Sequence, residues 1–460
     1  MNLLEISSNE DTIVALSTPQ GVGAIAVIRL SGKDAIAIVN KVFQGKDLQK
    51  QKSHTIHFGT IKDNNKIIDE VLVSIFIAPR SFTKENVVEI SCHGSSFIIK
   101  QIIQILLKNG ARLARAGEFT KRAFLNGQFD LAQAEAVADL IASDSEVAHQ
   151  AALRQMRGGF SLEIKELREK LIHFASMIEL EIDFVEEDVE FASRKDLEVL
   201  INQLLKVINR LIESFDLGNV IKNGVPTVIA GKPNTGKSTL LNALLNEERA
   251  IVSDVAGTTR DLIEDEINLG GVNFRFIDTA GIRETTDKIE AIGVAKTHAR
   301  MKEASLILYM FDLSNEAIEA IQSDIKKLET LKIPFIKIGN KMDQASPILL
   351  KQLEAIPDIL MISAETKENL EVLKDKILET INLSSFKTGN TIVTNARHYQ
   401  SLMQTRQSLE DVLTGLSRSI TNDFLALDIR HALHHLGEIT GEITNEDLLD
   451  NIFSKFCIGK

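Results

Sequence analysis

The sequence of 460 residues is poor in cysteine, and Cys92 and Cys457 are its only two. Two thiols cannot build a disulfide framework, which indicates a reducing compartment. The first eleven residues include Glu5, Glu10 and Asp11 and lack the positive and apolar regions of a signal peptide. No uncharged apolar run in the sequence approaches the roughly 18–20 residues of a membrane span. We therefore expect a cytoplasmic protein without a membrane span.

An excess of positive charge is also missing. Lys and Arg number 52 against 64 Asp and Glu, which gives a formal net charge of −12. Bulk wrapping of nucleic acid is therefore excluded, because phosphate contacts need clustered cations. A local basic patch stays open, and one candidate combines Arg112, Arg115, Lys121 and Arg122. With 44% hydrophobic and 25% charged residues the composition is that of a globular protein, and the length suggests about three domains.

The pattern of apolar residues divides the chain into four segments. Short apolar runs alternate with turn signals over 1–125, which predicts an α+β N-terminal domain. Helical periodicity follows over 126–222, strand–loop–helix alternation over 223–383, and helical periodicity again over 384–460. The sequence therefore predicts a multidomain fold, with an all-α helical domain split in sequence around an inserted α/β domain. In the first segment we expect strands over 12–16, 24–30, 55–61, 67–77 and 87–91, and helices over 34–43 and 97–108.

The inserted segment contains a phosphate-binding motif. Residues 231–238, GKPNTGKS, follow an apolar strand over 225–230 and precede an apolar helix over 239–245, the context that a P-loop requires. Backbone N–H groups and the helix N-terminus favour phosphate there. Lys237 is expected to reach the β- and γ-phosphates as a catalytic residue, and Ser238 to bind Mg²⁺; a plain glycine turn is the alternative. The expected nucleotide-binding residues of this loop are Asn234, Thr235, Gly236, Lys237, Ser238 and Thr239.

Two later motifs indicate that the nucleotide contains guanine. Asp343, in the motif NKMD, can accept hydrogen bonds from N1–H and the 2-amino group of guanine, a pair of donors that adenine lacks. Asn340 can hold the base edge and the loop, and the stem of Lys341 can cover the ring. In the motif SAE, Ser363 is followed by Ala364, whose N–H can donate to guanine O6.

Two further loops have the pattern of nucleotide-dependent switches. Asp278 follows an expected strand over 273–277 and is placed for the Mg²⁺ water shell, and Gly281 lets a backbone N–H meet the γ-phosphate. Thr259, in the motif GTTRD, can bind Mg²⁺ only when the γ-phosphate orders its loop. The nucleotide-binding residues expected in these loops are Gly257, Thr258, Thr259, Asp278, Thr279, Ala280 and Gly281.

Taken together, the motifs GKPNTGKS, GTTRD, DTAG, NKMD and SAE resemble those of translation-factor-related bacterial P-loop GTPases. The final CIGK, and the stretches IRLSG (28–32), RAGEFTKRAFLNG (115–127) and DLAQAEAVADLI (130–141), are similar to the MnmE (TrmE) family of tRNA modification GTPases. The resemblance covers essentially the whole chain. It implies that the inserted domain is a P-loop GTPase domain and that the N-terminal domain binds folate and dimerises.

The resemblance also implies how GTP is hydrolysed. Many GTPases place a water-orienting Gln after the glycine of DxxG, but here that position is Ile282. The family instead uses K⁺ and a distal glutamate, which Glu290 matches as a catalytic residue; an ordinary acid at a helix N-terminus is the alternative. The positions that match K⁺ ligands are Asn234, Ser253, Val255 and Thr258, in a loop where Asp254 and Ala256 are also expected to lie against the nucleotide.

A one-carbon folate site, for 5-formyltetrahydrofolate, is implied in the N-terminal domain. Arg29, Glu89, Gln128 and Lys460 match positions that contact the folate, although many members have Lys or Arg where Gln128 stands. Cys457 matches a cysteine that the modification needs and is expected as a catalytic residue. By itself it would be interpreted as a buried small hydrophobe.

As a whole, the resemblance implies a homodimeric, K⁺-dependent GTPase that acts with the flavin-dependent partner MnmG (GidA) in a heterotetramer or larger complex. With FAD and NADH on the partner, they would add an aminomethyl or carboxymethylaminomethyl group to C5 of the wobble uridine in certain tRNAs. The alternative is a ribosome-assembly or signalling GTPase without modification chemistry. Such GTPases lack the N-terminal domain and the CIGK tail.

Two clusters outside these motifs are interpreted as structural. Cys92 and His93 are neighbours in or beside an expected strand and so point to opposite faces, which favours a packed thiol and a turn histidine over a nucleophile pair. His431, His434 and His435 have metal-binding spacing on a helix, but without an HExxH motif we favour no metal site.

Overall fold

The computed structural model describes residues 11–64, 66–183, 193–248, 265–277, 301, 304–346, 353, 356–381, 391–418 and 420–459. The chain forms two compact units. The first contains Met1–Ile141, Arg154–Asn202 and Gln404–Lys460, and the second contains Ala142–Leu153 and Gln203–Met403.

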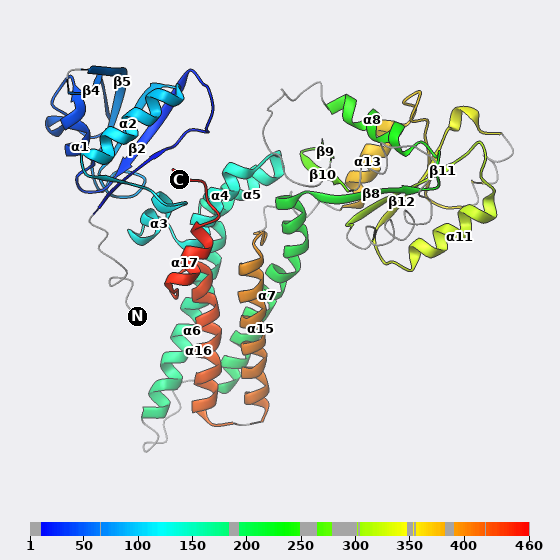
Figure 1. Ribbon diagram of the computed structural model, residues 1–460. Helices are drawn as coiled ribbons and strands as arrows, with labels where there is room; N and C mark the ends of the chain where they lie inside the picture. Colours follow the sequence, from blue (N-terminus) through cyan, green and yellow to red (C-terminus); the bar gives the residue numbers. More distant parts are fainter. Residues whose placement is uncertain are drawn as a thin grey trace. The chain divides into compact units, whose positions relative to one another are not determined.

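The first unit contains a seven-stranded sheet with the order β3-β4-β5-β6-β2-β1-β7 (Figure 1). Neighbouring strands are antiparallel, apart from the parallel pair of β1 and β7. The strands are β1 (Thr12–Leu16), β2 (Ile25–Ser31), β3 (Phe43–Gln44), β4 (Thr55–Asp63), β5 (Lys66–Phe76), β6 (Val87–His93) and β7 (Ala111–Leu113). The five longer strands lie where apolar alternation predicts them. β3 and β7 were not predicted, because two or three residues are too few to show an alternation.

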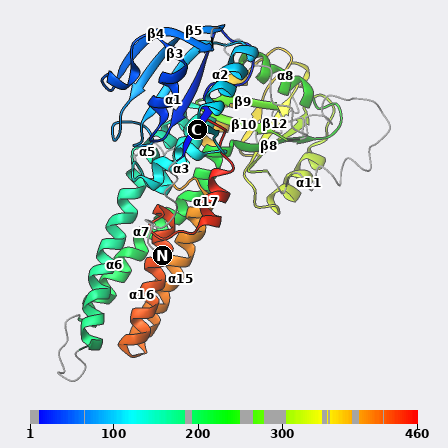
Figure 2. The ribbon, with the colours of Figure 1, turned by 60° about the vertical axis from the view of Figure 1, so that its left-hand side comes forward.

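Helices cover the sheet because its strands alternate in polarity. Val14, Ile28 and Ile90 point to one face and form a core with α1 (Ala35–Val42) and α2 (Ser96–Lys108). Figure 2 shows both helices lying on this sheet. Ile13 and Ala15 point to the other face of β1, where they pack on Phe119 of α3 (Glu118–Leu125). Successive strand residues thus enter two separate cores, as the period of two in a β-strand requires.

Helices from both expected parts of the helical domain pack together in this unit. α6 (Gly159–Asp183) packs along α16 (Asn422–Thr440), and Arg430 of α16 lies 2.7 Å from Glu179 of α6. α17 (Glu446–Phe453) packs on α3. α4 (Leu131–Ala142) and most of α15 (Ala396–Ser417) also belong to this unit, whereas most of α5 (Glu146–Met156) and of α7 (Arg194–Asn223) belongs to the second. The predicted fold class, with a helical domain split by an inserted α/β domain, is confirmed.

The second unit contains a six-stranded sheet with the order β13-β12-β11-β8-β10-β9. The strands are β8 (Val225–Gly231), β9 (Asp265–Leu269), β10 (Val272–Phe276), β11 (Leu306–Asp312), β12 (Phe335–Asn340) and β13 (Ile359–Met361). They are parallel except for β9, which pairs antiparallel with β10. The sequence predicted the parallel sheet but not this antiparallel edge strand.

Both faces of this sheet are covered. All seven residues of β11 are buried. The first six alternate between one core shared with α8 (Lys237–Glu248) and α13 (Leu370–Thr380) and another shared with α11 (Ile318–Glu329). A strand buried on both sides reads as a continuous apolar run, which is why the sequence shows no alternation here. Among the described residues, no helix is long and apolar enough to cross a membrane.

Candidate nucleotide site and candidate modification site

The nucleotide motifs meet at one edge of the second sheet. Gly231, at the end of β8, lies opposite Met310 of β11, and Asp312 at the end of β11 lies opposite Asn340 at the end of β12. Because these strands are parallel, the loops that follow their carboxyl ends share one edge, the usual ligand site of an α/β sheet. The P-loop, the NKMD loop and the SAE loop are therefore neighbours.

The P-loop owes its shape to two glycines. Gly231 has φ of +150°, and a Cβ there would lie 2.1 Å from the Met310 carbonyl oxygen. Gly236 has φ of +91°, and a Cβ there would lie 2.2 Å from Nδ2 of Asn340. Neither position accepts a side chain, so the loop can approach β11 and Asn340 closely and direct its backbone inward. Asn234 also has positive φ, at +59°, and is exposed.

Lys237 already points back along this loop. Its Nζ donates to the carbonyl oxygens of Gly231 at 3.0 Å and of Lys232 at 2.7 Å. Burial lowers the pKa of Lys237 from its usual value. The neighbouring Lys232 is instead paired with Glu316 at 2.7 Å. Of the two lysines, only Lys237 is directed at the loop backbone.

Asn340 links the P-loop to the SAE loop. Its side chain is 3% exposed, its Nδ2 donates to the Thr235 carbonyl oxygen at 2.8 Å, and its Oδ1 accepts from the Ala364 N–H at 2.9 Å. The expectation that Asn340 holds the loop agrees with these contacts. The Ala364 N–H is engaged by Asn340 here, so its donation to guanine O6 stays a prediction.

Two other residues of the NKMD motif, Lys341 and Asp343, lie at the same edge of the sheet. Lys341 has φ of +64°, and its Nζ lies 2.5 Å from Oδ2 of Asp312. A hydrogen bond from Ser363 lowers the pKa of Asp343, whose carboxyl group is fully exposed. A charged, exposed carboxylate is the acceptor that the guanine hypothesis needs.

Several predicted site residues lie outside the described residues. They are Ser253, Asp254, Val255, Ala256, Gly257, Thr258, Thr259, Asp278, Thr279, Ala280, Gly281, Glu290 and Lys460. Ile277, the residue after β10, directly precedes the DTAG motif. Its N–H donates to the Thr227 carbonyl oxygen of β8 at 3.0 Å. The chain thus enters the DTAG motif from the strand that was predicted.

In the first unit, two predicted folate residues form a pair. Arg29 of β2 lies directly opposite Glu89 of β6, and its Nε and Nη2 lie 2.9 and 2.8 Å from Glu89 Oε1. The guanidinium also lies 5.9 Å from the ring centroids of Phe82 and Phe119. Both charged side chains are about one quarter exposed, so the pair borders solvent. Gln128 is exposed in the turn after α3.

The CIGK tail lies against this same unit. Ile458 forms an antiparallel bridge with Ala116, and Ser17 donates through Oγ to the Gly459 carbonyl oxygen at 3.2 Å. Ser17 follows β1, whose residue Ala15 lies opposite Arg29. Cys457 is exposed rather than buried. The structure therefore brings the tail to the strand beside the Arg29–Glu89 pair.

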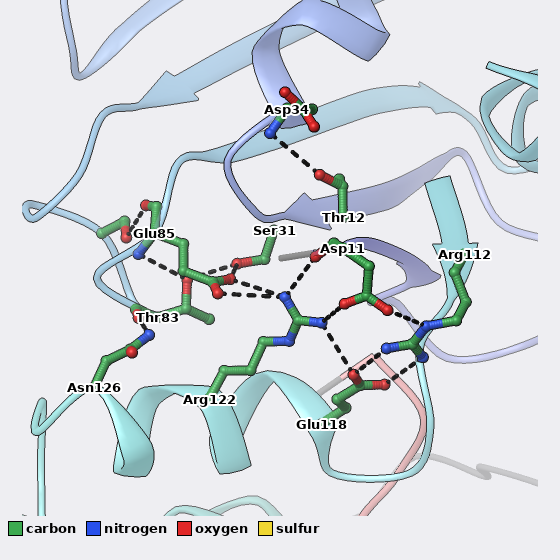
Figure 3. A network of polar contacts seen from close by, with 11 residues as sticks. Asp11, Thr12, Ser31, Asp34, Thr83, Glu85, Arg112, Glu118, Arg122 and Asn126 are labelled. Atoms are coloured by element: carbon green, nitrogen blue, oxygen red, sulfur yellow. Dashed lines mark hydrogen bonds and ion pairs between the residues drawn. The ribbon is translucent and has the colours of Figure 1, made fainter. Parts of the chain in front are cut away.

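The candidate basic patch is an ion-pair network instead (Figure 3). Arg112 lies 2.7 Å from Asp11 and 2.6 Å from Glu118, and the buried Arg122 lies 2.6 Å from Asp11 and 3.2 Å from Glu118. Lys121 pairs with an aspartate of α17 at 2.6 Å. The expectation of a basic patch is thus wrong for three of its four cations, because the nearby Glu118 and two carboxylates distant in sequence, Asp11 and Asp450, pair with them.

The network also lowers the pKa values of two of its carboxyl groups, Asp11 and Glu118. Hydrogen bonding from Arg112 lowers the pKa of Asp11. Burial alone would raise the pKa of Glu118, but hydrogen bonds from Arg112 and the Arg115 N–H lower it below its ordinary value. These residues also line a cavity of about 420 Å³ together with Phe453 of α17.

The two clusters interpreted as structural have the following surroundings. Cys92 is 3% exposed, and burial raises the pKa of its thiol to about 11, as expected of a packed thiol. His93 is the last residue of β6 rather than a turn residue, and its Nδ1 lies 2.7 Å from Asp69. His434 and His435 lie 3.5 and 3.3 Å from Glu438. Across the described ranges, no group of three or more His, Cys, Asp or Glu could hold a metal.

The parallel sheet, the P-loop and the two guanine-type loops at its edge define the class of a P-loop GTPase. Comparison with known proteins then identifies the family. The family model for the MnmE helical domain matches residues 131–457, and that for the N-terminus of the GTP-binding protein TrmE matches residues 12–128.

Relatives match over the full length. The tRNA modification GTPase MnmE of Cytophaga hutchinsonii is 59% identical over 460 residues, all of both chains. That of Flavobacterium psychrophilum is 56% identical over 98% of this chain and 99% of the relative. Among solved structures, the elongation factor SelB of Methanococcus maripaludis with a GTP analogue is 20% identical, covers 34% of each chain and has a TM-score of 0.27. The chain belongs to the MnmE (TrmE) family of tRNA modification GTPases, as its motifs predicted.

Two features of these sites were missed by the sequence interpretation. Asp312, the partner of Lys341, directly follows the apolar run of β11, so its position at the ligand edge could have been inferred. The contacts of Gly117 with the segment that follows α17 had no sequence signal, because they join residues far apart in the chain.

Proposed function

We propose that this tRNA modification GTPase is K⁺-dependent and homodimeric, and that it acts with an MnmG-type flavoprotein on C5 of the wobble uridine. The added aminomethyl or carboxymethylaminomethyl group would take its carbon from a one-carbon folate, with FAD and NADH on the partner. The observation that supports modification most directly is the position of residues 457–459 beside β1, the strand that pairs with the strand of Arg29.

In the nucleotide site, each described residue has a role that follows from its contacts. A bound phosphate would replace the two carbonyl oxygens as the partner of Lys237. Asp343 would accept from the guanine N1–H and 2-amino group, while Asn340 keeps the P-loop and SAE loop together. We assign water orientation to Glu290, because Ile282 has no polar group at the position where many GTPases have Gln.

The residues present fit the two ions. Ser238 and Thr259 supply hydroxyl oxygens, the hard ligands that Mg²⁺ prefers. Asn234 is exposed on the P-loop, where its carboxamide oxygen can bind K⁺ with the loop residues Ser253, Val255 and Thr258. When bound, these cations would neutralise charge on the phosphates.

The Arg29–Glu89 surface fits a folate. The pterin ring of a folate has an amino group and a ring N–H, from which a carboxylate can accept hydrogen bonds, and a flat face that an aromatic ring can cover. Glu89 supplies such a carboxylate, and Phe82 such a ring. Arg29 holds the Glu89 carboxyl group in place through its two contacts. A bound folate would supply the carbon unit, and Lys460 and Gln128 are proposed to contact it.

A second copy of the chain is proposed to cover an apolar surface of the first sheet. Phe58 of β4 and Leu72 of β5 lie directly opposite each other and are exposed, Phe58 by 66%. Ile56, two residues before Phe58, is exposed as well. A contiguous apolar patch of this kind is typical of a protein interface. We assign it to the homodimer because the family resemblance places dimerisation in this domain.

The test is analysis of wobble uridines in tRNA from a strain that lacks this gene. We expect the C5 modification to disappear, to return with the wild-type chain, and to stay absent with Cys457→Ser. Cys92→Ala is the matched control, because the thiol of Cys92 is buried and is expected to have no chemical role. Unchanged wobble uridines in the deletion strain would favour the ribosome-assembly or signalling alternative.

A further inference from the structure

Two glycines with left-handed backbone conformations lie close to distant segments of the chain in the first unit. Gly459, in the CIGK tail, has φ of +95°, and a Cβ there would lie 2.1 Å from the Leu16 carbonyl oxygen. Gly117, just before α3, has φ of +64°, and a Cβ there would lie 2.5 Å from the Phe453 carbonyl oxygen at the end of α17. Each glycine thus allows close contact with a segment more than 300 residues away in sequence.

Hydrogen bonds tie the same segments together. The Gly117 N–H donates to the Cys457 carbonyl oxygen at 3.4 Å, and Ser17 Oγ donates to the Gly459 carbonyl oxygen at 3.2 Å. The Ala116–Ile458 bridge lies between these two contacts. The tail is therefore held through its backbone along three successive residues.

Burial along the tail shows which residue anchors it. Gly459 is buried, whereas the side chains of Cys457 and Ile458 are exposed. The cysteine therefore contributes no packing to this attachment. Its thiol is left free while the backbone on both sides of it is fixed.

The geometry points to a two-glycine clasp, Gly117 and Gly459, that holds the tail and makes Gly459 a positioning residue for Cys457. This inference rests on the proposed role of Cys457 in tRNA modification. The clasp explains why an exposed thiol can work at a defined place. Because its exposed side chain is not packed against the protein, the position of Cys457 depends on the backbone of the residues beside it.

The experiment follows the tail directly, with a nitroxide spin label on Cys457 of the full-length protein. Since Cys92 is buried, one label per chain is expected, and Cys457→Ser should take up none. In the wild type the spectrum should be that of an immobilised label. In Gly459→Ala we expect the ratio of docked to free tail to fall about tenfold or more, because alanine is strained at this φ and its Cβ meets the Leu16 oxygen.

Gly110→Ala is the matched control. Gly110 has a similar φ of +109°, but a Cβ there would meet only a methyl group, at 4.0 Å. It should leave the label immobile. Ser17→Ala, which removes one hydrogen bond and adds no clash, should give an intermediate spectrum and guards against a folding defect in Gly459→Ala. The unfolding midpoint of each variant checks its folding.

Modification is measured in parallel in unlabelled variants. A mobile label together with at least about tenfold less modified wobble uridine in Gly459→Ala supports the clasp. An immobile label in Gly459→Ala overturns it, and so does a mobile label with normal modification. If the wild type itself modifies no uridine, the proposed function fails, whereas the spectra still decide whether the clasp exists.

Discussion

Replacing Asn340 by alanine tests how the loops of the nucleotide site are held together. The substitution removes a donor 2.8 Å from the Thr235 oxygen and an acceptor 2.9 Å from the Ala364 nitrogen, at a side chain that is 3% exposed. A buried polar group left unpaired costs about 1–3 kcal/mol, so two such groups cost about 2–6 kcal/mol before any water enters. With partial hydration we expect a loss near the lower end, about 2–4 kcal/mol.

These bonds order the loops before nucleotide binds, so the variant must order them at the expense of binding energy. If the loss is expressed in binding, the Kd for GDP and GTP should rise about 30-fold or more, at 1.4 kcal/mol for each factor of ten. Titration with a fluorescent guanine nucleotide measures it. Circular dichroism checks that the second unit is still folded.

Asn315→Ala is the control, because Asn315 is exposed and its side-chain amide donates to Ser314 Oγ, next to it in the chain, at 3.1 Å. It should bind nucleotide like the wild type. A Kd of folded Asn340→Ala within about threefold of the wild-type value, less than 1 kcal/mol, would refute the reasoning. The loops would then be ordered by the nucleotide alone.

The remaining predictions concern the hydrolysis, stability and assembly of the protein. Glu290→Ala should bind GTP normally but hydrolyse it about a hundredfold or more slowly. The wild-type protein should hydrolyse GTP much faster in K⁺ than in Na⁺, and equal rates in the two salts would contradict the K⁺ proposal. Arg122→Ala should lower the free energy of unfolding by about 1–3 kcal/mol in a urea titration, because Asp11 and Glu118 lose a buried hydrogen-bond donor and keep Arg112 as their remaining partner. Asp11 and Glu118 of this network have lowered pKa values. The stabilisation that they contribute is therefore present above about pH 4 and lost as the pH falls through their folded pKa values. A urea midpoint that stays constant down to pH 3 would argue against it. Phe58→Asp should convert a dimer to a monomer in sedimentation, while Phe97→Asp, at another exposed phenylalanine, should not.

The nucleotide site was largely readable from the sequence because each of its parts is local. A strand, a glycine loop and a helix are consecutive in the chain, and Gly231, Gly236 and Lys237 have conformations or contacts that suit a P-loop. Parallel strands then bring the separate motifs to one edge without further information. The ion pairs were not readable in this way. Four cations spaced closely in sequence suggested a basic patch, but Asp11 and Asp450 pair with three of them from distant segments.

The sequence by itself determined the family, the order of domains and the motifs, because these are properties of consecutive residues. Only the tertiary structure showed that Asn340 joins two loops and that Arg29 and Glu89 pair across two strands. It also decided that Gly117 lies against Phe453 of α17 and that Gly459 lies against Leu16 of β1. The reason is physical: a close backbone approach or a neutralised charge depends on which distant residue occupies the adjacent space, and no local pattern records that neighbour.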